Sequence, residues 1–351
     1  MFYIIIMVIA IVLIIPIKKR KDTPFSKMCF SISFLVSLLP SALRYGIGTD
    51  YFYTYVPYFR WIGNGQKEFG EVGFNLINKL IYNCTEDYRV LFFVTSFIIL
   101  FLIYKSIWEN SENIFQSILL IFIGQFYFYS MNLVRQAIAM SIIVYSFKYI
   151  KEKNILKTII SILIATLFHN SALIMIPILL ISFMNISNIK KILIGGSILL
   201  IQPLMLKLII WIMGFTKYIW YYEQGLFTEQ ISILLLIQNI MIFVIDIYYQ
   251  KVYKEKINDE YKILSNINFI GLCLMVLSSN IPLVFRMVRY CTVFQILLIP
   301  KIIGLSDNKT NKSILSVIIY GFMFISMVYQ IMICGGEGVY PYNSIFGTIL
   351  K

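Results

Sequence analysis

Apolar residues follow one another along this chain in long runs, not in the alternating pattern of a β-strand. Runs of about 17 to 22 residues are long enough for an α-helix to cross a bilayer core of roughly 30 Å. We therefore predict an all-α, polytopic integral membrane protein in which residues 1–351 form one transmembrane domain. Twelve spans are expected, near residues 2–17, 25–43, 88–104, 114–130, 134–150, 154–168, 170–186, 192–213, 230–249, 263–280, 287–303 and 313–333.

The composition supports a membrane protein. Of the 351 residues, 59% are hydrophobic and 13% are charged, and the mean hydropathy is +0.81, which leaves too little polar surface for a soluble domain. The net charge of +13 comes mostly from lysines in short loops beside the apolar runs, so we expect no nucleic acid partner. The five cysteines show no zinc-ligand spacing, and we expect neither a metal nor a cofactor.

The basic residues predict how the spans are oriented. The first run, residues 2–17, has no positive charge before it and four directly after it, so we expect a retained span whose N-terminus lies outside. With this orientation, 19 of the 30 basic residues fall in cytoplasmic loops, as the positive-inside rule requires, and 18 of them are lysines.

Arginines, in contrast, collect at the predicted outer face. Six of the seven fall there: Arg44, Arg60, Arg89, Arg135, Arg286 and Arg289. A planar guanidinium binds phosphate or carboxylate through two parallel hydrogen bonds, whereas orientation in the membrane needs only lysine. We therefore expect the outer face to bind an anion.

The outer loop 44–87 is the longest segment outside the predicted spans and the expected functional loop. It begins Arg44-Tyr-Gly-Ile-Gly-Thr-Asp50, where two glycines permit a tight turn. Arg44 either snorkels to the interface and pairs with Asp50, or it binds the anion. The aromatic residues that follow fit an interfacial belt or offer rings on which sugars can stack: Tyr51, Tyr53 and Tyr55.

Two further groups of arginines lie at predicted helix starts. Arg135 and Gln136 open the fifth span, where unpaired backbone N–H groups and the positive end of the helix dipole already favour an anion. Arg286 and Arg289 open the eleventh span, three residues apart and so on one helix face. Lipid headgroups or a substrate phosphate would satisfy either group.

The single histidine, His169, ends the sixth span. A histidine at a helix end can be purely structural, but the predicted depth, level with the arginines, also suits a general base near neutral pH. The acidic residues show no metal-ligand spacing and no DxD motif for a metal-bound nucleotide sugar. The sequence also lacks a P-loop, which argues against primary ATP-driven transport.

Four segments occur in the order of a known family. They are Arg44-Tyr-Gly-Ile-Gly-Thr-Asp50-Tyr, Glu71-Val-Gly-Phe-Asn75, Arg135-Gln136-Ala-Ile-Ala and Phe168-His169-Asn170-Ser171-Ala-Leu. Together they resemble the EpsG family of bacterial polysaccharide polymerases, which are Wzy-like. The resemblance covers residues 44 to about 177, and hydropathy alone matches the rest.

The resemblance implies a glycosyltransferase of the bacterial plasma membrane, independent of metals and nucleotides. It would polymerise undecaprenyl-pyrophosphate-linked oligosaccharide units at the outer leaflet, for capsule, O-antigen or exopolysaccharide. Membrane lipids and the flippase and chain-length regulator of the same pathway would be its partners.

The resemblance, together with the helix-end arguments above, leads to a hypothesis for the roles of the candidate residues; for Arg286 and Arg289 only the local argument applies. His169 would be the general base for the acceptor, with Asp50 as its substitute or its orienting partner. The pyrophosphate would be bound by Arg44, Arg135, Gln136, Arg286 and Arg289. The sugars would be contacted by Tyr51, Tyr53, Tyr55 and Glu71.

Other classes of protein also fit about twelve spans. A flippase or exporter of lipid-linked oligosaccharides would carry charges deep within its spans and repeated halves, and the sequence shows neither. An O-antigen ligase-like transferase or a membrane acyltransferase would also use a membrane histidine. The acyltransferase should approach its acyl donor from the cytoplasm, whereas His169 is predicted outside.

Overall fold

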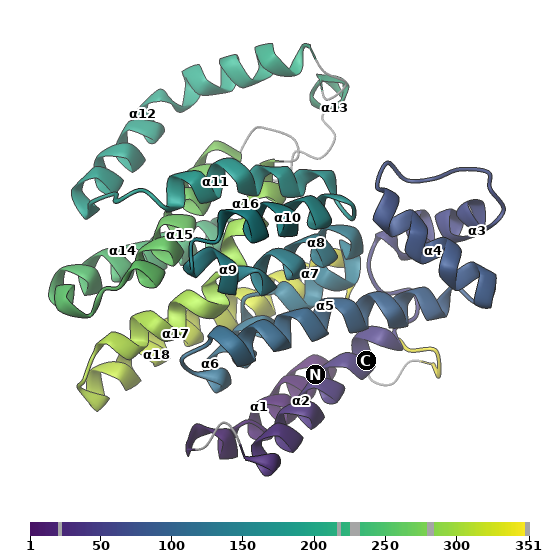
Figure 1. Cartoon of the computed structure of the whole chain (residues 1–351), viewed down its shortest axis with the longest axis horizontal. Coiled ribbons are helices and arrows are strands. Elements are labelled where there is room, and N and C mark those ends of the chain that lie inside the picture. The colour runs from purple at the N-terminus through teal and green to yellow at the C-terminus, as the bar shows by residue number, and fades with distance from the viewer. Residues whose placement is uncertain (20–22, 216–218, 225–231, 279–283, 348–351) are drawn as a thin grey trace. The chain divides into compact units, whose positions relative to one another are not determined.

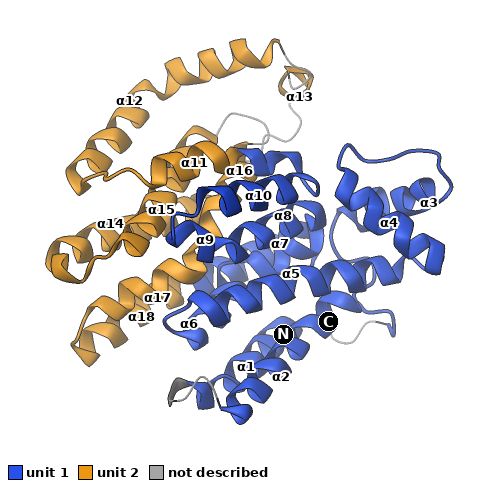
Figure 2. Ribbon diagram, in the orientation of Figure 1, with its two compact units in different colours: residues 1–173, 323–351 blue, residues 174–322 orange. Residues whose placement is uncertain are grey.

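The structure, a computed structural model, describes residues 1–19, 23–215, 219–224, 232–278 and 284–347. These residues are helical, with short connections and two isolated β-bridges near residue 344. They divide into two compact units, which Figure 2 colours separately. The first unit comprises Met1–Leu173 and Met323–Lys351, and the second comprises Ile174–Phe322. That the chain forms one transmembrane domain stays a prediction.

The helices of the first unit precede residue 173, and a C-terminal segment completes it (Figure 1). They are α1 (Phe2–Val12), η1 (Ile15–Lys19), α2 (Pro24–Ala42), η2 (Tyr51–Tyr55), α3 (Val56–Gly63), α4 (Val72–Cys84), α5 (Arg89–Asn110), α6 (Ile114–Ile123), α7 (Phe126–Asn132), α8 (Val134–Tyr145), α9 (Phe147–Lys151), α10 (Ile155–Thr166), most of η3 (Asn170–Ile174), η6 (Val328–Ile333) and η7 (Gly336–Gly338).

The second unit contains the longest helix of the described chain, α12 (Asn188–Met213). The others are α11 (Met175–Ser182), α13 (Ile219–Glu223), α14 (Ile233–Val252), η4 (Lys254–Lys256), α15 (Asp259–Leu277), α16 (Val284–Thr292), α17 (Gln295–Leu305) and α18 (Lys309–Met327), whose last turns belong to the first unit.

The all-α fold agrees with the sequence, but twelve spans are not shown. Six segments of the described chain are long and apolar enough to cross a membrane: α2, α5, α12, α14, α15 and the stretch Lys309–Ile333. Two bent pairs raise the number to eight if each is one span, namely α6 with α7 at 49° and α16 with α17 at 44°. Such a set of helices indicates a multi-pass membrane protein.

The expected spans 114–130 and 134–150 are broken into shorter helices. Here the chain forms α6, α7, α8 and α9, of 10, 7, 12 and 5 residues. Every residue of α7 is buried, as are nine of the twelve in α8. Hydropathy does not distinguish a short helix buried in protein from one that faces lipid, which is why both spans were predicted at full length.

Small polar side chains join the helices of the first unit. The Ser41 hydroxyl of α2 donates to the Ser96 hydroxyl of α5 at 3.0 Å, and the Ser106 hydroxyl of α5 donates to the Val144 carbonyl of α8 at 2.8 Å. Small residues allow helix backbones to approach closely, and interhelical hydrogen bonds satisfy them away from water. α8 packs on both α5 and α10, so it joins α10 to the rest of the first unit.

The expected loop 44–87 is largely helical. It forms η2, α3 and α4, which gather at the end of α5 where that helix begins (Figure 1). The mostly apolar face of α4 buries Phe74 and Ile81, while Lys79 and Glu68 form an exposed ion pair at 2.5 Å. The loop is thus a small folded layer that can hold side chains in fixed positions.

We expect α4 to lie outside the cell, because the positive-inside rule places the lysine-poor side there. Cys84 ends α4 and is exposed, as is Cys334 beyond η6. A membrane-impermeant maleimide should therefore label intact cells that carry the protein, and the Cys84→Ser/Cys334→Ser double variant should lose this labelling. Labelling that requires permeabilised cells would reverse the orientation.

Candidate functional site

Three of the predicted site residues meet at one carboxylate. Glu71 Oε2 accepts a hydrogen bond from Arg135 NH1 at 2.7 Å, and Glu71 Oε1 lies 3.2 Å from His169 Nδ1. The side chain of Glu71 is 7% exposed, that of His169 15% and that of Arg135 22%. Glu71 therefore lies innermost, with the cation and the imidazole between it and the surface. We call these three residues the Glu71 cluster.

The charge state of Glu71 follows from its partners. Burial raises the pKa of the carboxyl group, but the hydrogen bond to His169 and the charge of Arg135 outweigh burial and hold the pKa below its usual value. Glu71 is therefore ionised at neutral pH. An ionised carboxylate at Nδ1 favours the proton on that nitrogen, so the Nε2 lone pair becomes the basic position of the ring.

The segment Glu71-Val-Gly-Phe-Asn75 explains how the Glu71 cluster forms. The Gly73 N–H donates to the Leu167 carbonyl at 2.8 Å. A Cβ on Gly73 would lie 2.9 Å from Leu167 Cβ and 3.0 Å from its carbonyl oxygen, which is too close for any other residue without movement. Because Leu167 is two residues before His169, this approach brings Glu71 within reach of the imidazole.

Asn75 fixes the turn that precedes Glu71. Its side-chain oxygen accepts from the Phe69 N–H at 3.0 Å, and its amide nitrogen donates to the Phe69 carbonyl at 2.8 Å. The ring of Phe69 then lies 4.2 Å from the guanidinium carbon of Arg135, a cation–π contact that helps to hold the planar group in place. The same motif therefore positions Arg135 as well as His169.

Arg135 lies in the first turn of α8, where backbone N–H groups have no partner within the helix itself. The buried Tyr55 hydroxyl faces this helix start. Burial raises the pKa of Tyr55, and the charge of Arg135 and the backbone N–H groups of Val134 and Arg135 oppose that rise. The start of α8 thus carries a partly exposed guanidinium on a positive helix end, as the sequence predicted.

A second network, centred on Asn132, joins three distant segments. The Asn132 side-chain oxygen accepts from the Thr49 hydroxyl and from the Asp50 N–H, each at 3.0 Å, and its amide nitrogen donates to Glu337 Oε2 at 2.7 Å. Asn132 is three residues before Arg135. The turn that contains Asp50 is therefore tied to the start of the helix that carries Arg135.

The C-terminal segment 336–347 pairs with residues 43–48. Three backbone hydrogen bonds of 3.0 Å join them, from Tyr45 N–H to the Asn343 carbonyl, from Gly48 N–H to the Gly338 carbonyl, and from Ile345 N–H to the Leu43 carbonyl. Gly48 has a φ of +94°, and a Cβ there would lie 2.9 Å from the Met131 carbonyl. The glycine of this turn is thus required by its conformation and by the close approach of α7.

Arg44 is placed differently from the prediction. Its side chain is 1% exposed, donates to the Ser41 carbonyl and to the Ser96 hydroxyl at 2.9 Å, and lies 4.7 Å from the Phe92 ring centroid. Burial lowers the pKa of Arg44 to about 10, so the group stays charged at neutral pH. Arg44 is buried at the start of the loop and holds it against α5. Its guanidinium is not accessible to an anion in the solvent.

The predicted sugar-contacting tyrosines also differ from one another. Tyr53 is 88% exposed, whereas Tyr51 and Tyr55 are 1% and 2% exposed. Tyr51 stacks on Phe92 with ring centroids 4.0 Å apart. Burial leaves Tyr53 as the one ring of the three that is open to a sugar.

The remaining predicted residues lie outside the Glu71 cluster. Gln136 is 2% exposed on α8. Asp50 accepts a hydrogen bond from the Thr54 hydroxyl at 3.3 Å, so the carboxylate bonded to His169 Nδ1 is that of Glu71. Arg286 and Arg289 both lie on α16, as predicted, and the guanidinium of Arg289 is over the Phe285 ring at 4.9 Å. A pyrophosphate-binding role for either arginine stays a prediction.

Two features of the site were missed from the sequence. Glu71 was expected to touch sugars, yet it links Arg135 to His169 across 64 and 98 residues. The segment Glu71-Val-Gly-Phe-Asn75 contains the signal that could have revealed this role. A flexible loop would not need its glycine and its asparagine, whereas a fixed turn in close contact with another segment does. Glu337 carries no such signal, because it lies in a short segment 205 residues beyond Asn132.

The Glu71 cluster can perform acid–base chemistry beside a bound anion. A carboxylate-oriented imidazole is a general base, and the exposed edge of Arg135 can bind phosphate. In the described part of the chain, no three His, Cys, Asp or Glu side chains are grouped so that they could hold a metal ion. The chemistry that these residues offer is proton transfer with electrostatic stabilisation of a leaving group.

The fold and the site together define a multi-pass helical membrane protein with an arginine–glutamate–histidine site at one end of its first unit. The sequence model of the EpsG family matches residues 27–344, and the chain belongs to this family. Membership indicates a membrane protein of polysaccharide biosynthesis. The comparisons with curated proteins and with solved structures gave no match.

The contact between Gly73 and residue 167 can be tested without an activity assay. His169 is the single histidine of the chain, so the ultraviolet absorbance of carbethoxylated imidazole after diethyl pyrocarbonate treatment reports on it alone if the protein is purified without a histidine tag. Gly73→Ala should push α4 away from Leu167 and expose His169 to faster carbethoxylation. Gly70→Ala is the matched control, because a Cβ there meets one side-chain atom at 3.9 Å. Equal rates in the two variants would contradict the close approach.

Proposed function

We propose that this protein polymerises undecaprenyl-pyrophosphate-linked oligosaccharide units at the outer leaflet of the bacterial plasma membrane. The observation that carries the proposal is the Glu71 cluster, which puts a partly exposed guanidinium and an oriented imidazole on the same carboxylate. Family membership supports polysaccharide biosynthesis, and the site adds a leaving-group binder and a base. Capsule, O-antigen and exopolysaccharide are the product classes.

The reaction is a glycosyl transfer. A hydroxyl oxygen of the incoming lipid-linked unit attacks the anomeric carbon of the growing glycan, and the bond between that carbon and the pyrophosphate oxygen breaks. The electron pair of this bond leaves with undecaprenyl pyrophosphate. The hydroxyl proton moves to Nε2 of His169, and from there to solvent. No nucleotide or external oxidant is needed to balance the step.

Arg135 stabilises the departing pyrophosphate. Negative charge grows on the leaving oxygen as the bond breaks, and a guanidinium already held in position stabilises that charge without further reorganisation. NH1 bonds to Glu71, and the planar group lies over Phe69. The positive end of α8 adds to the same field.

Glu71 orients both partners. Its bond to Nδ1 fixes the imidazole tautomer, and its ion pair with Arg135 fixes the guanidinium. Tyr53 would offer the sugar an exposed ring. Asp50 would be the substitute base for the acceptor. It lies in the neighbouring turn, which Asn132 holds next to the start of α8.

Replacing Arg135 with lysine keeps the charge but removes the planar donor group. Cells that rely on Arg135→Lys should accumulate single lipid-linked repeat units and lose long polymer, as measured by the length of glycans on the lipid carrier. Arg60→Lys is the control, because Arg60 lies on α3 outside the Glu71 cluster. Normal chain lengths in Arg135→Lys would contradict the pyrophosphate role.

Removing the base should stop the chemical step without affecting the fold. His169→Gln should lower polymerisation in reconstituted membranes by roughly 10²- to 10⁴-fold, the usual contribution of general base catalysis. Glu71→Gln should show a smaller loss, because the imidazole remains but is no longer oriented by a charge. Wild-type turnover by His169→Gln, at equal protein level, would assign the base to another residue. Translocation of the labelled lipid-linked unit without chain growth by the wild-type protein would favour a flippase instead.

A further inference from the structure

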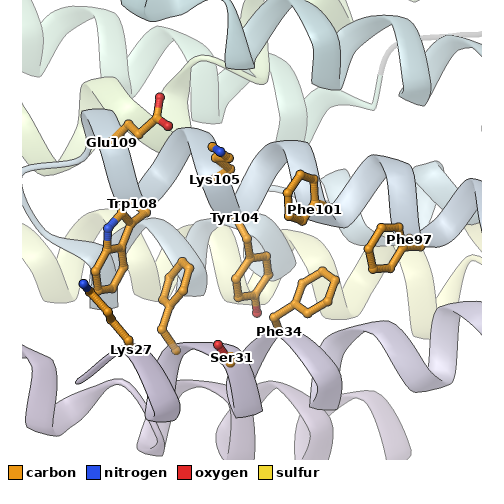
Figure 3. A pocket seen from close by; sticks show the side chains of 10 residues that line it. Lys27, Ser31, Phe34, Phe97, Phe101, Tyr104, Lys105, Trp108 and Glu109 are labelled. Atoms are coloured by element: carbon orange, nitrogen blue, oxygen red, sulfur yellow. The ribbon is translucent and has the colours of Figure 1, made fainter. Parts of the chain in front are cut away.

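The turn at residues 46–50 is positioned by polar contacts as well as by the apolar packing near it. Aromatic side chains of α2 and α5 line a pocket of about 430 Å³ (Figure 3). The last of them on α2 is Phe34, eight residues before that helix ends, so the rings of this pocket do not extend to the turn. The turn is bonded directly by the Asn132 side chain and by the Gly338 carbonyl, and both segments contribute to its position.

Glu337 has a backbone conformation that favours glycine. Its φ is +64°, in the left-handed region that residues with a Cβ seldom adopt. Its neighbours are Gly335, Gly336 and Gly338, and the first and last of these are left-handed as well, at +68° and +62°. A glycine at position 337 would adopt this conformation without strain, and strained residues cluster at functional sites. The conformation therefore points to a role for the glutamate side chain.

The glycine turn 335–338 lies close to the site. A Cβ on Gly338 would be 3.0 Å from Thr49 Cγ2 and 3.2 Å from the Thr49 nitrogen, so the two turns are in tight contact. This contact brings the Glu337 carboxylate to the last residue of α7, where Oε2 accepts a hydrogen bond from the Asn132 amide nitrogen at 2.7 Å.

Glu337 fixes the direction in which the Asn132 amide faces. An ionised carboxylate can only accept hydrogen bonds, so the amide nitrogen must face Glu337. The backbone N–H of Asp50 can only donate, so the amide oxygen must face Asp50. The Thr49 hydroxyl donates to the same oxygen. If the amide were reversed, two donors would face each other at Asp50 and two acceptors at Glu337.

We propose that Glu337 is a positioning residue of the site. Through Asn132 it holds the turn that carries Asp50 against the break between α7 and α8 at Leu133, two residues before Arg135. The C-terminal segment thereby supplies a part of the site that is distant in sequence from both the α4 layer and α8. The catalytic consequence rests on the proposed function, whereas the contact itself does not.

Hydrogen exchange of the full-length protein, measured by mass spectrometry over residues 44–52, tests the contact without an activity assay. Glu337→Gly removes the carboxylate and relieves the backbone, so exchange there should be roughly 3- to 10-fold faster, as expected for one lost hydrogen bond. Glu337→Gln keeps an acceptor for Asn132 and should match the wild-type protein. Lys153→Gly is the matched control, because Lys153 is also left-handed, at +55°, and lies between α9 and α10.

An exchange of donor and acceptor gives a second test that does not depend on the glycine variant. Asn132→Asp puts two carboxylates face to face and should speed exchange over residues 44–52. In Asn132→Asp/Glu337→Gln the glutamine amide can donate to the new carboxylate, whose other oxygen still accepts from Asp50. This double variant should therefore recover slow exchange. Fast exchange in it, or unchanged exchange in both Glu337→Gly and Asn132→Asp, would overturn the proposal.

Chain elongation in reconstituted membranes links the contact to the reaction. Glu337→Gly should lower kcat by roughly 10- to 100-fold, because a small misplacement of catalytic groups has an effect of that size, and it should change KM little. Glu337→Gln and Asn132→Asp/Glu337→Gln should restore most of the rate, and Lys153→Gly should keep it.

The kinetic outcomes separate this proposal from the proposed function. Faster exchange in Glu337→Gly with unchanged kcat would overturn the positioning role. An equal loss of rate in Glu337→Gln and Glu337→Gly would overturn it in favour of a direct contact between the charge and the substrate. If the wild-type protein elongates no chain, the proposed function fails, and the exchange measurements still decide whether Glu337 holds the turn.

Discussion

The site depends on one buried carboxylate. Glu71 is ionised because His169 and Arg135 both stabilise its charge, and those two residues are oriented because the carboxylate is there. The arrangement is possible since a glycine at position 73 lets α4 approach Leu167 more closely than any side chain would permit. A single backbone contact thus couples an electrostatic network to the packing of α4 against the end of α10.

This dependence explains the number of polar contacts that hold η2, α3 and α4 in the first unit. Asn75 fixes the turn before Glu71, and Asn132 ties a second turn to the helix that carries Arg135. Asn75 bonds groups of its own turn, whereas Asn132 bonds groups from two segments distant in sequence. These polar junctions add to the hydrophobic packing of residues such as Phe59 and Phe74 in fixing the geometry of the segment.

The sequence was most informative where a residue type has few possible structural or chemical roles. Long apolar runs predicted α2, α5 and α12 as candidate membrane-crossing helices, while the same criterion made one span of residues 134–150, where the structure has two shorter helices. His169 and Arg135 were predicted as site residues from their types and helix-end positions, and the structure brings them together. Arg44 shows the limit of that reasoning, since the sequence does not reveal that its guanidinium is enclosed by Ser96 and Phe92.

The C-terminal segment that pairs with residues 43–48 has a consequence for biosynthesis. Tyr342 bonds to the Pro40 carbonyl across 302 residues of sequence. At 5 to 20 residues per second, roughly 15 to 60 s of translation separate the two partners. The early helices can enter the membrane during this interval, but the backbone N–H groups of Tyr45 and Gly48 lack the carbonyls that they bond to until Gly338 and Asn343 have been made. Membrane insertion and the completion of the site are therefore separate events, and a ribosome that stops early leaves an inserted protein whose turn at residues 43–48 is unfinished.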